Sequence, residues 1–338
     1  MTVPREEQFT GCLIGQCLGD ALGFPVEGRS PAACRQYVEE MLRTGRAGER
    51  GRGAFAFGQY TDDSQLARDL LQSYLACGKF DPQDYARRIA AIFHEGRVIG
   101  EGIATAEAAR RLEKGVPWEK AGAPPPSAGN GSAMRAGPVG LLFFDDPGQL
   151  IRVADDQGRI THQDRRCSAG AVAIAGAVAL ALEGPPIARN RFLLQLAKWA
   201  ETIENSVASY IRKLAEWLSL PPERAVTPIS RAGIAPGYSD RWEGISPFVT
   251  SSVLWSLYSF LRSPDDYWET VCTAIAVGGD VDTTAAMAGA ISGAHLGLDA
   301  IPCDLSQRLT DQGTWGYSEL VELARRCYQF KTEGAVDP

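Results

Sequence analysis

The chain has 338 residues, of which 45% are hydrophobic and 22% are charged, and its formal net charge is -7. Such a composition is typical of a globular protein that buries a large core without needing disulfides or a structural metal in order to fold. The negative net charge disfavours tight nonspecific binding to nucleic acid or to an anionic membrane, so we expect no stable nucleic-acid partner and no membrane partner.

Cysteine usage and the N-terminal sequence indicate a cytoplasmic location. The 8 cysteines are spread along the chain, with no CxxC pair and no zinc-type Cys/His spacing. We therefore expect reduced thiols that pack as small hydrophobic residues in the cytoplasm. The N-terminus lacks a basic segment followed by a clean apolar stretch, which argues against a signal peptide.

Apolar residues recur at helical spacing along most of the chain, and strand-like alternation is scarce. This pattern predicts helices over residues 65–76, 85–93, 104–114, 192–201, 207–218 and 249–261. Two further segments, 169–182 and 283–297, are rich in Ala and Gly, which permits helices to approach closely, so we expect them at the buried centre. We predict an all-α fold.

Glycine and proline mark the connections between these helices. The predicted loops are 45–58, 122–131, 184–186 and 221–247. The last is longer than a typical connection, which indicates a functional loop or an insertion. Its Tyr238 and Trp242 are candidates for stacking on a base, or they simply pin the loop. None of these segments has the character of an interdomain linker, so we predict a single domain over residues 1–338.

Two aspartate clusters each stand directly before a predicted helix. The first contains Thr61, Asp62 and Asp63, and the second contains Asp280, Asp282 and Thr283. N-capping explains one acidic residue at a helix start, but it explains paired carboxylates poorly because they repel each other. Four carboxylates with two hydroxyls form an all-oxygen set that suits Mg²⁺ or Mn²⁺ and, less specifically, Ca²⁺. Two divalent cations would neutralise the four carboxylates, so a two-metal site is plausible on charge grounds.

These clusters and three other segments resemble the motifs of the ADP-ribosylglycohydrolase family, which includes dinitrogenase reductase-activating glycohydrolase and the ADP-ribosylhydrolases of animals. The five matches follow the family order over most of the chain, so together they are far more specific than any single motif. They comprise residues 11–23 with Glu27, 61–64, 129–135, 161–164 and 279–290.

The resemblance implies an all-helical domain with a binuclear Mg²⁺ or Mn²⁺ centre that hydrolyses the bond at C1″ of ADP-ribose. The implied metal ligands are Thr61, Asp62, Asp63, Asp280, Asp282 and Thr283. The implied catalytic residues are Glu27, Asp62 and Asp63. The implied substrate-binding residues are Gly129, Asn130, Gly131, Ser132, Met134 and His162. The expected partner is an ADP-ribosylated macromolecule, most simply a protein modified on arginine, with ADP-ribose as the product.

Several alternatives stay open at this level. In one alternative the enzyme hydrolyses ADP-ribose linked to serine or to nucleic acid instead of arginine. In another the chain is a crystallin-like protein that binds ADP-ribose without catalysis. The serine-specific animal members carry an aromatic residue where this chain has Ala128. The nitrogenase-related members carry an acid that aligns only loosely with Glu101. A helical terpenoid synthase fits less well, because Lys213 stands where its second metal motif needs an acid.

Overall fold

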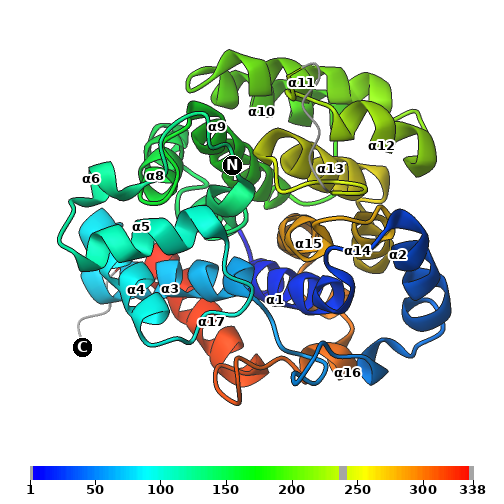
Figure 1. Cartoon of the computed structure of the whole chain (residues 1–338), viewed down its shortest axis with the longest axis horizontal. Helices are drawn as coiled ribbons and strands as arrows, with labels where there is room; N and C mark the ends of the chain where they lie inside the picture. The colour runs from blue at the N-terminus through cyan, green and yellow to red at the C-terminus, as the bar shows by residue number, and fades with distance from the viewer. Residues whose placement is uncertain (1–2, 236–241, 335–338) are drawn as a thin grey trace.

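Two helices rich in glycine and alanine, α1 (Glu6–Gly23) and α15 (Val281–Leu296), lie side by side at the centre of the protein (Figure 1). The computed structural model describes residues 3–235 and 242–334. Nearly the whole length of both helices is buried. A helix that is apolar on every face has to be covered on every face. The remaining helices therefore surround this central pair and share one hydrophobic cluster with it.

The surrounding α-helices of the described residues are α2 (Pro31–Tyr37), α3 (Asp62–Cys77), α4 (Pro82–His94), α5 (Ile103–Glu113), α6 (Trp118–Ala121), α7 (Gly137–Leu142), α8 (Pro147–Arg159), α9 (Arg165–Ala181), α10 (Arg189–Glu201), α11 (Asn205–Trp217), α12 (Pro222–Ser230), α13 (Val249–Arg262), α14 (Tyr267–Ala276), α16 (Cys303–Ser306) and α17 (Tyr317–Glu333). Figure 1 shows α3, α4 and α5 on one side of the central pair, α2 and α14 on the other, and α10 to α12 across the top. The described residues contain isolated β-bridges but no β-strand, which confirms the all-α prediction.

Glycines set the spacing between α1 and α15. A Cβ on Gly15 would lie 2.5 Å from the carbonyl oxygen of Gly289, and a Cβ on Gly289 would lie 2.2 Å from that of Gly15. The same relation links Gly11 with Gly293 further along the antiparallel pair. Only residues without a side chain let the two backbones meet in this way. The contact brings Gly23, at the end of α1, against Asp282 at the start of α15.

We expect Gly289→Ala to lower the free energy of unfolding by about 3 kcal/mol, because the new methyl group meets backbone atoms that have no room to move. Gly148→Ala is the matched control, since Gly148 is exposed in α8 and contacts only the ends of flexible side chains. This control is expected to leave stability unchanged or raise it by up to about 1 kcal/mol. Urea unfolding of both variants measures the difference. Equal stability of the two variants would contradict the tight crossing.

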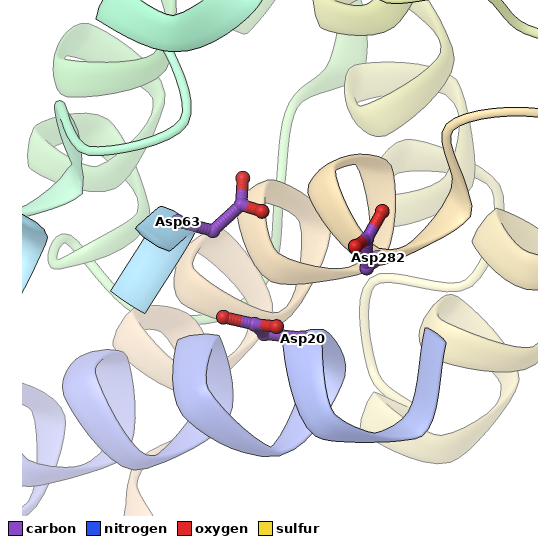
Figure 2. A group of neighbouring side chains, drawn as sticks. All are labelled: Asp20, Asp63 and Asp282. Carbon is purple, nitrogen blue, oxygen red and sulfur yellow. The ribbon is translucent and has the colours of Figure 1, made fainter. Parts of the chain in front are cut away.

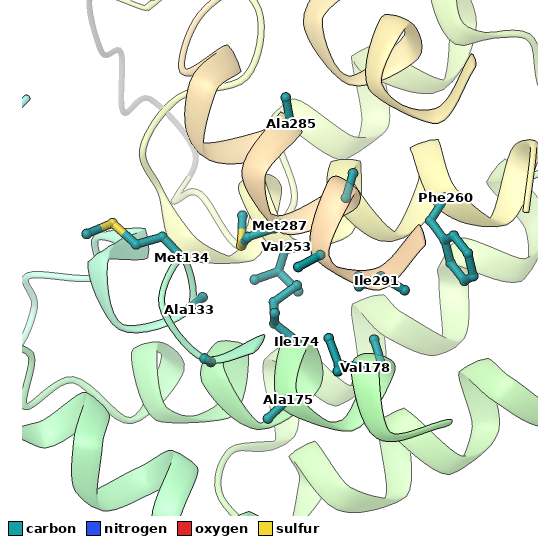
Figure 3. Packing of buried hydrophobic residues seen from close by; sticks show 14 of the residues in the cluster. Ala133, Met134, Ile174, Ala175, Val178, Val253, Phe260, Ala285, Met287 and Ile291 are labelled. Carbon is teal, nitrogen blue, oxygen red and sulfur yellow. The ribbon is translucent and has the colours of Figure 1, made fainter. Parts of the chain in front are cut away.

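The hydrophobic core lies where α9, α13 and α15 meet. Figure 3 shows Ile174 of α9, Val253 of α13 and Met287 of α15 pointing into the same space. The two Ala/Gly-rich segments predicted at the buried centre correspond to α9 and α15, so that prediction is confirmed.

The segment Glu6–Val26 is long and apolar enough to cross a membrane by length and composition alone. Its most apolar window is 100% buried within the protein, where α15 and α17 pack against it. The core helix of a globular protein passes the same test. We had not predicted this helix from periodicity, because a helix that is apolar on all faces carries no amphipathic signal.

The other predicted helices each overlap an observed helix, with ends displaced by a few residues. The prediction of one long loop over residues 221–247 is wrong in its first part, which forms α12. That helix begins with Pro222 at its first turn, where a missing N–H costs nothing. Tyr238 lies outside the described residues, whereas Trp242 is partly buried within them.

Candidate active site

The two predicted aspartate clusters meet in space. The first stands at the start of α3 and the second at the start of α15. Thr283 Oγ1 lies 3.3 Å from Asp63 Oδ2 and 3.1 Å from Asp280 Oδ1, so a single hydroxyl joins both clusters. All six predicted ligand residues are at most 5% exposed. Figure 2 shows Asp63 and Asp282 approaching one another from their separate helices.

Capping does not account for these carboxylates. Elsewhere in the protein, acidic side chains accept hydrogen bonds from the first turn of the helix that they precede, as Asp81, Asp146, Asp164, Glu204 and Asp266 do. The residues in the same position before α3 and α15 are Thr61 and Asp280, and neither makes a side-chain capping bond. The capping explanation therefore fails at the two helices where it was an alternative to metal binding.

Asp20 of α1 supplies the missing cap for α3, a role that sequence reasoning missed. Its carboxylate accepts the backbone N–H of Thr61 at 3.0 Å and that of Ser64 at 3.2 Å. It also accepts the hydroxyls of both residues, at 3.0 and 2.7 Å. The available signal was chemical: Asp20 is a single carboxylate in the apolar stretch 8–23, and a lone buried charge needs partners.

The carboxylates form two overlapping groups that could hold metal ions. Asp20, Asp63 and Asp282 each offer an oxygen within 4.8 Å of the others, and so do Glu27, Asp280 and Asp282. Asp282 belongs to both groups. The oxygens of Asp20 already accept several donors, so we assign it a positioning role. Asp63 Oδ1, in contrast, is buried without any hydrogen-bond partner. An orphaned carboxylate oxygen in an all-oxygen pocket fits a hard divalent cation.

Asp62 lies beside these groups instead of within them. Its backbone N–H donates to the carbonyl of Ile99 at 2.8 Å, and the N–H of Gly102 lies 3.5 Å from its Oδ2. The segment that contains these two residues therefore covers Asp62 and links it to α5. Glu101 in the same segment is exposed and faces a surface pocket with His94, Arg110 and Glu113.

Burial dominates the electrostatics of the cluster. Loss of hydration raises the pKa of Asp280 to about 6 and that of Asp20 to about 7, and it raises the pKa of Asp63 well above its usual value, where Asp20 and Asp62 add repulsion. Burial followed by the charge of Glu27 likewise raises the pKa of Asp282. Such a concentration of buried negative charge is costly without a compensating cation.

Glu27 is the exposed member of the cluster. It follows the short helix Phe24–Val26 at the end of α1, and its side chain is 24% exposed. Arg52 donates a short hydrogen bond to its carboxylate and lies with its guanidinium 4.9 Å above the ring of Phe24. Among the described residues, Arg52 is the cation that forms an ion pair with a carboxylate of the cluster. Glu27 thus stands between the buried aspartates and solvent.

The Gly-rich segment 129–135 reaches the cluster through Asn130. Its side-chain amide donates to Asp280 Oδ2 at 2.6 Å and to Ser252 Oγ at 3.0 Å, so Asn130 orients a carboxylate of the cluster. The hydroxyl of Ser132 donates to the carbonyl of Cys167, and Met134 lies in the hydrophobic cluster. The predicted substrate contacts of these residues stay predictions, and the side chains of Ser132 and Met134 already have protein partners.

His162 lies against the same segment. A Cβ on Gly131 would be 2.7 Å from its Cε1, and a Cβ on Gly129 would be 3.3 Å from its Nε2. The three elements that sequence reasoning assigned to one site, namely the aspartate clusters, the Gly-rich segment and the Thr-His pair, are therefore contiguous. The whole is a group of buried carboxylates that lies beside a segment with glycine at 129 and 131.

Comparison with known proteins gives the same family along the whole chain. The sequence model of a family described as ADP-ribosylglycohydrolase matches residues 1–335. The chain is 31% identical to ADP-ribosylhydrolase ARH3 of Gallus gallus, with 88% of each chain covered. It is 25% identical to ADP-ribosylarginine hydrolase Tri1 of Pseudomonas putida, with 88% of this chain and 72% of that protein covered. A solved structure described as an ADP-ribosylglycohydrolase-related protein complex superposes with a TM-score of 0.73 at 26% identity, covering 97% of this chain and 99% of the other.

Proposed function

Because the chain belongs to the ADP-ribosylglycohydrolase family, we propose that it removes ADP-ribose from arginine side chains of a modified protein, with two divalent cations at the aspartate cluster. The chain is an ADP-ribosylhydrolase, a hydrolase of glycosidic bonds. We further propose that it acts in the cytoplasm and that its target is a protein.

The observation that carries the metal proposal is the pair of overlapping carboxylate groups that share Asp282. Asp63, Asp280 and Asp282 would hold the ions, with Glu27 beside them and Asp20 fixing the start of α3. Oxygen donors alone favour Mg²⁺ or Mn²⁺ over softer metals. When bound, the ions would supply Lewis-acid character, hold the ribose hydroxyls and lower the pKa of a water molecule.

The residues of this chain then divide the remaining tasks. Asp63 Oδ1 is free of protein donors, so it can accept a proton from the attacking water as well as bind an ion. The negative field of the buried aspartates stabilises positive charge at C1″ as the glycosidic bond breaks. Glu27, at the solvent side, would meet the leaving group.

The environment of Glu27 supports an arginine linkage. Its carboxylate already binds one guanidinium, that of Arg52, at the edge of the pocket. An ADP-ribosylated arginine would present the same kind of group there, and carboxylates bind guanidinium groups in a favourable planar geometry. Similarity to an ADP-ribosylarginine hydrolase supports the same linkage. Because identity to ADP-ribosylhydrolase ARH3 is higher, substrates with other linkages have to be assayed beside the arginine-linked one.

The test is release of free ADP-ribose from three substrates: an arginine-linked peptide, a serine-linked peptide and ADP-ribosylated DNA. We expect release from the arginine-linked peptide in Mg²⁺ or Mn²⁺, and none after EDTA treatment. Release from only the serine-linked peptide or the DNA would reject the proposed linkage and keep the reaction. Undiminished release in EDTA would reject the metal proposal.

A further inference from the structure

A chain of three buried polar side chains runs behind the Gly-rich segment, from Arg135 through Thr161 to His162. Arg135 Nη2 donates to Thr161 Oγ1 at 2.8 Å, and Thr161 Oγ1 lies 2.8 Å from His162 Nδ1. None of the three is more than 2% exposed. We propose that Arg135 and Thr161 are positioning residues that hold His162, a substrate-binding residue implied by the family resemblance, as the neutral Nε2–H tautomer, so that it meets ADP-ribose as a hydrogen-bond donor. The ligand part of this inference rests on the proposed function.

The direction of the hydrogen bonds follows from the chemistry of the donors. A guanidinium has no acceptor, so Arg135 can only donate to Thr161. The hydroxyl of Thr161 keeps one proton, and in the part of the chain that the structure describes its only other hydrogen-bonding neighbour is His162 Nδ1. A buried hydroxyl proton without an acceptor is unfavourable. Thr161 therefore donates to Nδ1, and a neutral imidazole that accepts at Nδ1 carries its proton on Nε2.

Burial, and after it the charge of Arg135, keeps the imidazole ring of His162 neutral. Arg135 Nε donates to Gln157 Oε1 at 2.9 Å, and its Nη2 donates to the carbonyl of Gln157 at 2.8 Å. No carboxylate forms an ion pair with it among the described residues, although the charge of Asp62 acts on it from a greater distance. Burial and the charge of Arg135 lower the pKa of His162 to about 3. Asp164 acts in the opposite direction, but it is itself paired with Arg166 at 2.8 Å.

The remaining nitrogen faces the wall of the site. His162 Nε2 lies 3.3 Å from the positions that a Cβ would take on both Gly129 and Gly131. Within the described residues no hydrogen bond involves this atom, and unlike Asp63 Oδ1 it is not fully enclosed, so it can take a partner from outside the protein. The glycines let the imidazole ring pack directly on the backbone of the Gly-rich segment, so an ADP-ribose bound beside that segment would meet Nε2 as a hydrogen-bond donor. His162 in this form cannot act as a general base, because its basic nitrogen is occupied by Thr161.

The tautomer can be read directly, because the chain contains only 3 histidines. Protein labelled with ¹⁵N-histidine is compared with its His162→Gln variant, which assigns the signals of His162. We expect a protonated Nε2 and an unprotonated Nδ1, unchanged between pH 8 and pH 5. Addition of ADP-ribose with Mg²⁺ should shift the Nε2 signal. A protonated Nδ1 in the wild type overturns the proposal, and absence of any shift with bound ADP-ribose overturns its ligand part.

Thr161→Val removes the hydroxyl and preserves the shape of the side chain, and Thr161→Ser restores the hydroxyl. In the valine variant we expect a mixture of tautomers and an affinity for ADP-ribose about tenfold weaker by calorimetry. The serine variant should resemble the wild type in both respects. A valine variant with the wild-type tautomer and affinity would reject the relay. Both readouts use free ADP-ribose and no hydrolysable linkage, so failure of the hydrolysis panel would not affect them.

Discussion

Asp282→Asn is expected to lower kcat/KM for ADP-ribose release by at least about 100-fold, an effect comparable to removal of one preorganised electrostatic contact. Asp282 is the carboxylate common to both groups of the cluster, so its loss weakens two ion sites together. The variant should still fold. Asn offers an oxygen to the N–H of Thr283, which Asp282 now accepts at 2.9 Å, and it removes a buried charge. We therefore expect calorimetry to show the loss of tight Mg²⁺ or Mn²⁺ binding in a protein of undiminished thermal stability.

Asp84→Asn is the matched control for this substitution. Asp84 is a largely buried carboxylate of α4 that pairs with Arg88 at 2.8 Å and accepts the hydroxyl of Ser73, away from the cluster. This control should bind cations and hydrolyse substrate as the wild type does. If Asp282→Asn retained wild-type cation affinity and activity, the shared-ligand assignment would be wrong. If both variants lost activity, the effect would belong to general destabilisation.

Divalent cations are expected to stabilise the protein more at pH 7.5 than at pH 5.5. At a cation concentration about 100 times its Kd, mass action raises the free energy of unfolding by about 2.7 kcal/mol, or Tm by about 5 °C. Protons compete at the lower pH, because burial raises the pKa of Asp280 to about 6 and raises the pKa values of Asp63 and Asp282 well above the usual value for Asp. The cation then has to displace protons from carboxylates that are neutral at pH 5.5 in the cation-free fold.

The sign of the pH effect follows from the direction of these shifts. The folded state holds protons that the unfolded chain, with an Asp pKa near 3.8, has already released. The contribution of the cluster to the free energy of unfolding therefore falls as pH rises from about 4, near the pKa of the unfolded chain, to about 6 to 7, where the folded state releases its protons. Burial lowers the pKa of His162 and His295, which act in the opposite direction. Comparing Tm with and without cation at each pH cancels those histidines, and an equal gain in Tm at both pH values would contradict the prediction.

Local sequence was sufficient for the parts of the protein that depend on near neighbours. Helical spacing of apolar residues predicted α3, α4, α5, α10, α11 and α13, because an amphipathic helix repeats its buried face every three to four residues. Paired carboxylates such as Asp62 and Asp63 indicated a positively charged ligand, because one acid is enough to cap a helix and two adjacent acids repel each other. The resemblance to ADP-ribosylglycohydrolases rested on the order of five motifs, and the comparisons confirm it.

The roles of individual residues around the site depended on distant partners. Asp20 caps a helix whose first residues are 41 and 44 positions away, and no spacing in the sequence encodes that distance. Asn130 reaches Asp280 across 150 positions and orients a carboxylate, where the motif alone suggested contact with substrate. The sequence likewise did not predict the protein contacts of Ser132 and Met134, because the helices packed against a side chain decide its direction.

By itself, then, the sequence determined the all-α class, the family and the two acidic motifs, because periodicity and motif chemistry are local properties. Tertiary structure decided how these parts combine. The glycine contact between Gly15 and Gly289 sets α1 against α15, and that crossing brings the end of one helix to the start of the other. It also decided the contacts of His162, which lies beside the hydroxyl of Thr161. That hydroxyl in turn accepts a hydrogen bond from Arg135, 26 positions earlier in the chain. Burial makes these long-range contacts decisive, since a charge or proton removed from water is governed by the few groups that the fold places beside it.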